Sequence, residues 1–167
     1  GMFPWTALVP AAVLRWVGEA TRVTAMGITF VTMRADQEGV MRAVRIPDHL
    51  EIVAEMACGA LAHFQHSEVT GTGAGNDMTL YGSEGTLRFA DDALWGARRG
   101  EDELSEIEVP PEEAAGWRVE QEFVNAIRGV EEVKLTTFED GLRYMEFVEA
   151  VSRSMLERRT IALPLAR

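Results

Sequence analysis

Glycines divide the middle of the chain into short runs of strand-forming residues, and this segmentation constrains the fold more than any other feature. Between Glu51 and Val109 the runs are EIVAEMAC, ALAHFQHSEV, DMTLYG, GTLRFA and ALWGARR. Each run has the length of one strand, and the glycines between the runs suit tight turns. The block therefore predicts an antiparallel meander.

A further strand-forming segment lies upstream, from Thr21 to Asp36, and predicts one long strand. Alternation places Val23, Ala25, Val31 and Met33 on one face, and Met26, Ile28 and Phe30 on the other. Both faces are partly apolar, so both need a cover, and the chain has too few helices for two layers. We expect something other than these helices to cover the second face.

Three helices are predicted from the spacing of apolar residues. The first spans Phe3 to Gly18, with Gly18 as its stop, and the second spans Trp117 to Val130. The third begins at Thr137, which forms a variant of the capping box with Asp140. Its expected buried stripe is Leu142, Met145, Val148, Met155 and Leu156, with Tyr144, Phe147 and Val151 beside it.

The remaining segments complete one α+β domain over residues 3–167. An acidic, proline-containing loop is expected from Glu101 to Glu113, and a short edge strand from Thr160 to Leu163. The architecture is a large, predominantly antiparallel sheet with helices packed on one face, the other face being open or used for dimerisation. Gly1 before Met2 is typical of a cleaved tag, so residues 1–2 are interpreted as a tag remnant and start.

Composition excludes several classes of protein and partner. The 167 residues carry a formal charge of −11, which repels phosphate backbones and anionic head groups, so neither nucleic acid nor a membrane is expected as a partner. The apolar stretch from Trp5 to Val17 is interrupted and too short to span a bilayer. A single cysteine, Cys58, forms no internal disulfide and is expected to be a small buried residue, consistent with a cytoplasmic protein.

Histidines offer the only candidate ligand-binding chemistry among the strands. On a strand, His63 and His66 point to opposite sides, which argues against a joint metal site. His63 shares the more polar face with Gln65 and Ser67, so His63 and Gln65 are the candidate substrate-binding residues. A purely structural histidine is the simpler alternative.

Two loops invite a functional interpretation that a turn explains more simply. The glycine-rich run from Gly71 to Asn76 resembles a phosphate loop, but it leads into a strand rather than a helix, which favours a hairpin loop. Asp48 and His49 follow Pro47 ahead of a strand, where either a ligand contact or a turn role is possible.

Three stretches together resemble the C-terminal domain of the Gfo/Idh/MocA oxidoreductases, a family that includes glucose–fructose oxidoreductase and inositol dehydrogenase. They are DMTLYGSEGTLRFADD (Asp77 to Asp92), EFVNAIRG (Glu122 to Gly129) and TTFEDGLRYMEFVEAVSRSMLERRTIAL (Thr136 to Leu163), in the family's order. The resemblance implies an open sheet with helices on one face and an oligomer interface on the other. It also implies an N-terminal Rossmann domain that binds NAD or NADP, with a sugar or polyol substrate between the two domains.

The family's catalytic residues have no counterparts here. The only lysine, Lys134, lies in EEVKL rather than in the family's Glu-Lys-Pro tripeptide. The family's Asp and His, four residues apart and upstream of a Leu-Arg-Trp sequence, align with Trp5 and Val9. Either the alignment shifts there or the pair has been lost, so no catalytic, cofactor-binding or metal-binding residue is assigned.

Two functions follow from these observations. In the first, the chain is the substrate-binding and oligomerisation domain of an NAD(P)-dependent oxidoreductase, forms a homodimer through its open sheet face, and is not catalytic by itself. In the second, it is a non-catalytic dimerisation or small-ligand-binding module without a cofactor.

Overall fold

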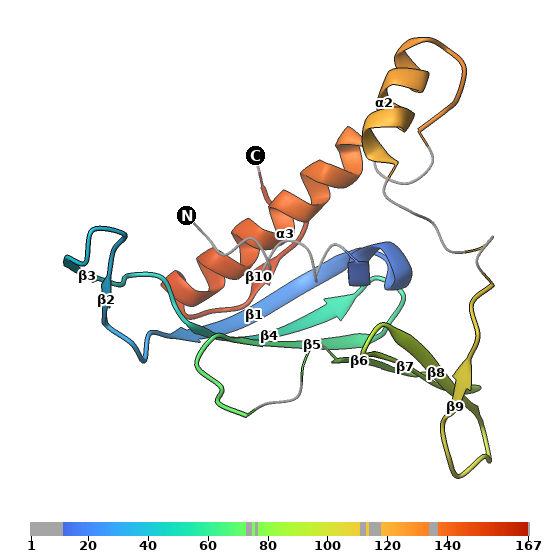
Figure 1. Cartoon of the computed structure of the whole chain (residues 1–167), viewed down its shortest axis with the longest axis horizontal. Helices are drawn as coiled ribbons and strands as arrows, with labels where there is room; N and C mark the ends of the chain where they lie inside the picture. The colour runs from blue at the N-terminus through green and yellow to red at the C-terminus, as the bar shows by residue number, and fades with distance from the viewer. Residues whose placement is uncertain are drawn as a thin grey trace. The chain divides into compact units, whose positions relative to one another are not determined.

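The computed structural model describes residues 12–72, 75, 77–110, 113, 118–133 and 137–166 (Figure 1). The chain divides into two compact units, Gly1–Thr70 together with Val133–Arg167, and Gly71–Glu132. Of the predicted first helix, residues 12–17 are described and are helical. Gly18 ends this helix as predicted, with a φ of 99° and its N–H donated to the Leu14 carbonyl at 3.0 Å.

The first unit contains an antiparallel sheet with the strand order β10-β1-β4-β5. Its strands are β1 (Ala20–Ile28), β4 (His49–Met56), β5 (Leu61–Ser67) and β10 (Ile161–Ala162). The last of these is an edge strand paired with β1, which confirms the strand predicted near the end of the sequence.

One face of this sheet is covered by the long helix α3 (Phe138–Glu157), which Figure 1 shows lying across it. Residues of β4 alternate between buried and more exposed positions, as expected for a strand with one covered face. The core between helix and sheet consists of Ala20, Val23, Ala25, Leu50, Ile52, Ala54, Met56, Phe147, Ala150, Val151 and Ile161.

The predicted start of α3 is confirmed, but its predicted buried stripe is only partly confirmed. Val148 is buried and Met155 packs against the core, as do Phe147 and Val151, which were predicted beside the stripe. Thr137 and Asp140 form the capping box, with the Asp140 N–H donated to the Thr137 hydroxyl at 3.2 Å. The side of the helix that meets the sheet carries Phe147, Val148, Ala150, Val151 and Ser154, whereas Leu142, Met145 and Leu156 are exposed.

A serine explains why the buried face was misjudged. Ser154 is fully buried, and its hydroxyl accepts the Ala25 N–H at 2.9 Å and donates to the Arg159 carbonyl at 2.7 Å. These two bonds satisfy the hydroxyl, so a polar residue lies against the sheet at no desolvation penalty. A search for apolar residues alone passes over this position.

No helix among the described residues covers the opposite face of the sheet, which is called the open face. Met26, Ile28, Val53 and Leu61 are exposed on it. The predicted separation of Val23 and Ala25 from Met26 and Ile28 is thereby confirmed.

The strand predicted from Thr21 to Asp36 ends early, at Ile28. The reason is Asp48, which is almost completely buried. Its carboxylate oxygens accept the N–H groups of Phe30 at 2.8 Å and Val31 at 2.9 Å, so a side chain replaces a strand as the partner of these amides. The observed role of Asp48 is this long-range hydrogen bonding, whereas the sequence favoured a local turn; Phe30, Val31 and Met33 leave the sheet.

Beyond this break the chain forms a separate two-stranded ribbon from β2 (Met33–Ala35) and β3 (Met41–Ala43). At its tip, Asp36 accepts the N–H groups of Glu38 at 3.0 Å and Val40 at 2.9 Å. All six strand residues are exposed.

The second unit is a four-stranded meander in the order β6-β7-β8-β9, followed by one helix. The elements are β6 (Asp77–Tyr81), β7 (Gly85–Ala90), β8 (Ala93–Arg98), β9 (Ser105–Ile107) and α2 (Val119–Ile127). Gly129, with a φ of 67°, ends the helix in a Schellman motif in which the Val130 N–H bonds to the Asn125 carbonyl at 3.0 Å.

The α+β class and the antiparallel pairing are confirmed, with the described strands distributed over three sheets instead of one large one. β9 forms inside the segment predicted as a loop, because its residues pair with β8 despite their acidic neighbours. β5 and β6 belong to different sheets and do not pair as a hairpin, and the run from Gly71 to Asn76 between them lies partly outside the described residues. Cys58 lies in the turn between β4 and β5 and is exposed, because the chain leaves the sheet after Met56.

Candidate functional site

Four polar side chains meet on the open face of the first unit's sheet. His49 and Glu51 come from β4, and His63 and Gln65 from β5. In the register of the two strands Glu51 stands opposite Gln65, and both histidines project from the same face. The sequence-predicted candidates His63 and Gln65 are therefore brought together around Glu51.

The carboxylate of Glu51 is the centre of this cluster. Its Oε1 accepts the Gln65 amide at 2.7 Å and lies 3.1 Å from His49 Nε2, while Oε2 lies 2.8 Å from His63 Nε2. The Gln65 hydrogen bond, together with the histidine contacts, holds the pKa of Glu51 below its ordinary value of 4.5, although burial opposes this shift. Glu51 is thus ionised at neutral pH.

These contacts fix the orientation of the surrounding side chains. With Nε2 engaged, the imidazole of His63 presents Nδ1 on its other side, and Gln65 presents its carbonyl oxygen. The ring of Phe30 meets the His49 ring edge-on, with 5.9 Å between centroids. The cluster therefore offers pre-oriented hydrogen-bonding groups beside an aromatic ring, which is chemistry suited to hydroxyl-bearing ligands.

Sequence reasoning found two of the four members of this cluster. It treated His49 as a loop residue and did not consider Glu51. The signal that identifies Glu51 is the pairing register of β4 and β5, which places it directly across from Gln65.

The other histidine of β5 lies apart, as predicted. His66 is on the opposite face from His63, and its Nε2 is 4.0 Å from Glu68 Oε1. Among the described residues, no group of three His, Cys, Asp or Glu side chains is arranged to hold a metal ion.

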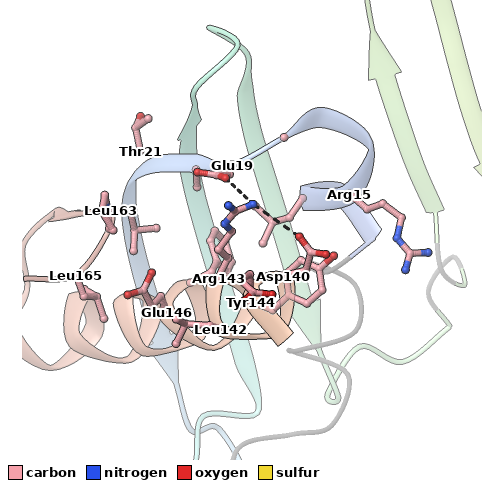
Figure 2. A pocket seen from close by; sticks show the side chains of 16 residues that line it. Arg15, Glu19, Thr21, Asp140, Leu142, Arg143, Tyr144, Glu146, Leu163 and Leu165 are labelled. Carbon is pink, nitrogen blue, oxygen red and sulfur yellow. Dashed lines mark ion pairs between the residues drawn. The ribbon is translucent and has the colours of Figure 1, made fainter. Parts of the chain in front are cut away.

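A hollow of about 730 Å³ lies beside the first half of α3 (Figure 2). Figure 2 shows the Arg143 guanidinium between two carboxylates, with its Nη1 2.9 Å from Glu19 Oε1 and 3.7 Å from Asp140 Oδ1. The lining residues are Leu14, Arg15, Gly18, Glu19, Ala20, Thr21, Glu139, Asp140, Leu142, Arg143, Tyr144, Glu146, Phe147, Leu163, Pro164 and Leu165.

The carboxylate of Asp140 already accepts hydrogen bonds at the start of α3, which leaves it less suited to binding a ligand. The backbone N–H of Thr137, followed by the Thr137 hydroxyl, lowers the pKa of Asp140 below its ordinary value. Both groups donate to Oδ2 at 2.8 Å. In this hollow Arg143, Glu19 and Asp140 thus already satisfy one another, and it is the weaker candidate for a binding site.

Several residues singled out from the sequence lie outside the described part of the chain. These are Trp5, Val9 and Lys134. Within the part that is described, no helix has both the length and the apolar character needed to cross a membrane.

The sequence matches no family model, and no curated protein matches it. Solved structures do share its fold. An NAD-binding oxidoreductase from Klebsiella pneumoniae is 18% identical with a TM-score of 0.78, over 96% of this chain and 50% of the other.

Two further structures give the same picture. Apo levoglucosan dehydrogenase is 19% identical with a TM-score of 0.81, over 98% of this chain and 51% of its own. The WlbA dehydrogenase from Bordetella pertussis, in complex with NADH and UDP-GlcNAcA, is 22% identical with a TM-score of 0.65, over 94% of this chain and 43% of its own. The chain thus spans about half the length of the oxidoreductases whose fold it shares.

Proposed function

We propose that this chain is the C-terminal domain of an NAD(P)-dependent oxidoreductase of the Gfo/Idh/MocA family, which acts on a sugar, a polyol or a related small molecule. The observation that carries the proposal is the fold match over nearly all of this chain and half of NAD-binding dehydrogenases. Three sequence stretches that resemble the same family support it independently.

The nucleotide belongs to the other half of such an enzyme. A dinucleotide site needs a glycine-rich turn between a strand and a helix, so that backbone amides face the pyrophosphate. The run from Gly71 to Asn76 leads into β6 instead, so these residues do not fit a nicotinamide cofactor. The chain by itself is expected to bind neither NAD⁺ nor NADP⁺.

The open sheet face is proposed to be a homodimer interface. Met26, Ile28, Val53 and Leu61 expose apolar surface there, while α3 covers only the opposite face. Exposed apolar patches of this kind mark interaction sites, and a second copy of the same face gives a closed, isologous dimer.

His63 and Gln65 are proposed to contact substrate hydroxyl groups. They lie on β5, at the edge of the sheet, and Glu51 holds both in fixed orientations. Because they share the open face with Val53 and Leu61, the substrate is proposed to bind at the margin of the homodimer interface. Pre-oriented side chains lose less conformational entropy when a ligand binds.

The proposal is tested on the complete polypeptide encoded by the gene. We expect it to bind NAD⁺ or NADP⁺ and to reduce the nucleotide in the presence of at least one member of a panel of sugars and polyols. Isothermal titration of the present chain alone should show no nucleotide binding. Low-micromolar binding by this chain, or a complete polypeptide without nucleotide binding, would overturn the proposal. In the second case, a dimerisation or small-ligand module without a cofactor becomes the better description.

The substrate role of the cluster has its own test. In the complete enzyme, His63→Ala and Gln65→Ala should each raise KM about tenfold, as expected for losing a binding contact of about 1.4 kcal/mol. Leu156→Ala, an exposed position on α3, serves as the control and should leave KM unchanged. Unchanged KM in both cluster variants would remove His63 and Gln65 from the substrate site.

A further inference from the structure

The β2–β3 ribbon has two chemically different faces. Its register pairs Met33 with Ala43 and Ala35 with Met41, so these four side chains share one face. Arg34 pairs with Arg42 on the other face. The ribbon is therefore amphipathic, although it makes no extensive contact with a helix in the described structure.

The charged face is neutralised locally. Two arginines directly opposite each other would destabilise a ribbon. Here Arg42 Nε lies 2.8 Å from Asp36 Oδ2, and Arg34 Nη2 lies 3.6 Å from Asp48 Oδ2. Each guanidinium has its own carboxylate, so this face is satisfied without an external partner.

The apolar face is not satisfied in the same way. Met33 is 46% exposed and Met41 is 56% exposed. Val31 and Val40, beside the two strands, are exposed as well. The face formed by Met33, Ala35, Met41 and Ala43, called the methionine face, thus remains exposed apolar surface.

The ribbon is nevertheless held in one shape. An isolated two-stranded hairpin is only marginally stable in water. This one is braced at its base, where Asp48 binds the amides of Phe30 and Val31, and at its tip, where Asp36 binds the amides of Glu38 and Val40. Figure 1 shows it projecting beyond the end of β1. A braced projection with one uncovered apolar face is pre-organised for docking.

We propose that the β2–β3 ribbon is an assembly arm whose methionine face packs on the same face of a second copy of this chain. Large and small side chains alternate on this face, because Met33 lies beside Ala43 at one strand pair position and Ala35 lies beside Met41 at the next. A twofold rotation about an axis in the plane of this face places each methionine over an alanine of the partner. The surface is therefore complementary in shape to itself, as an isologous contact requires.

Charge favours the same occupant. Residues 29–46 contain three arginines and two acidic residues, in a chain whose formal charge is −11. Two copies approach through this segment without the repulsion that the rest of their acidic surface produces. Methionine also adapts its shape to a partner surface.

The arm extends the homodimer proposed above and rests on that proposal. A stable interface buries at least about 1,200 Å² in total, more than one short ribbon supplies, so the arm must act together with the open sheet face. The two are continuous in the chain, because β1 passes from its exposed residues Met26 and Ile28 directly into Phe30 and Val31.

Sedimentation velocity of the present chain across a concentration series tests the arm. The double variant Met33→Gln with Met41→Gln keeps side-chain length without charge and should weaken self-association at least about tenfold, as expected when a buried contact cluster is lost. Leu156→Gln is the matched control, because it removes an exposed apolar residue from α3, and it should leave the dissociation constant unchanged. Leu61→Asp perturbs the open sheet face separately.

Cross-linking reports the geometry directly. In a Cys58→Ser background, proteins carrying only Met33→Cys are mixed with proteins carrying only Ala43→Cys or only Ala35→Cys, and a short bis-maleimide is added. We expect heterodimeric product in one of the two mixtures, according to the direction of the twofold axis. A Leu156→Cys protein should give none with either partner.

The outcomes separate the arm from the sheet-face dimer. If the arm variant weakens association and cross-links form, the arm is supported. If the wild-type chain dimerises, Leu61→Asp dissociates it and the arm variant does not, the arm proposal is overturned while the sheet-face dimer stands. A wild-type chain that stays monomeric at tens of micromolar overturns both, without bearing on the oxidoreductase assignment.

Discussion

The two units use the same antiparallel pairing but bury very different amounts of apolar surface. In the first, α3 and the sheet enclose eleven buried apolar residues. In the second, Ala90 is the one buried apolar residue among those described, and α2 buries none. Ladder hydrogen bonds alone contribute little net stability, so the first unit is expected to be much the more stable.

The difference shows that glycine spacing predicts the strands of a meander but not the second layer that must cover one of its faces. Leu87, Phe89 and Ile107 of the second unit's sheet remain exposed, as do Phe123 and Ile127 of α2. A sheet becomes a stable layer when a second layer covers one face. In the first unit that layer is α3, and this contrast leads to four predictions.

The largest expected effect is on the core of the first unit. Phe147 is 1% exposed, and Met145, two residues away on the same helix, is 61% exposed. Phe147→Asp should therefore cost about 4 kcal/mol or more and abolish the cooperative thermal transition, whereas Met145→Asp should change stability by no more than about 0.5 kcal/mol. Circular dichroism melts of both variants decide this. The reverse result would return Met145 to the buried stripe.

A second variant separates the two units. A Cβ at Gly85 would collide with the Ala97 carbonyl oxygen and lie 3.1 Å from Arg98 Cα, both backbone atoms. Gly85→Ala should cost about 1–3 kcal/mol in the second unit.

Hydrogen exchange read by peptide mass spectrometry locates that loss. Protection should fall in β6 to β9 and remain in β1 and β4. Gly82→Ala is the control, because its Cβ would lie at 3.4 Å from the Gly85 carbonyl, an ordinary van der Waals distance. Loss of protection in both units would show that they unfold as one.

Acid should destabilise the first unit. Hydrogen bonds hold the pKa values of Asp36, Asp48, Glu51 and Asp140 below their ordinary values, and in the second unit the pKa of Asp77 is lowered in the same way. A carboxyl group whose pKa is lowered by folding stabilises the fold at any pH above its pKa in the unfolded chain. This contribution is lost as the pH falls through the pKa of the group in the folded protein.

Protection of the first unit should therefore decline as the pH falls from about 5 to about 3, through the ordinary values of Glu and Asp. Melts across this range, with exchange measured per unit, provide the test. Glu51→Gln removes one of the titrating groups and should flatten the dependence. A first unit indifferent to acid would contradict the hydrogen-bonding pattern described here.

The smallest effects concern two glycines at opposite ends of helices. A Cβ at Gly141, in the first turn of α3, meets nothing within 4 Å, so Gly141→Ala should stabilise the first unit by about 0.5–1 kcal/mol. Gly129, just after α2, has a φ of 67°, so Gly129→Ala should destabilise that helix end by about 1 kcal/mol. Helicity and melting temperature of the two variants should move in opposite directions.

Local chemistry made part of this molecule predictable. The capping box at Thr137 depends on residues three apart, and the stop at Gly18 depends on one residue. The opposite directions of His63 and His66 follow from the period of a strand. Each of these features is decided within one element, which explains why the sequence was sufficient.

The errors share one cause, which is that a distant residue intervened. Asp48 ended β1 by binding the amides of Phe30 and Val31. Ser154 took a core position because Ala25 and Arg159 satisfied its hydroxyl. No window of neighbouring residues contains such partners.

The candidate site likewise contains residues that one strand predicts and a residue that only the pairing of two strands reveals. His63 and Gln65 were predicted from the polar face of one strand, but Glu51, which holds both, became visible only through strand register. The sequence by itself determined the α+β class, the antiparallel strands, the helix ends at Gly18 and Thr137, and the opposite directions of His63 and His66, because these depend on local conformational preference. The tertiary structure alone decided the buried face of α3, the end of β1 and the grouping around Glu51, because these depend on hydrogen-bond partners and packing between residues far apart in the chain.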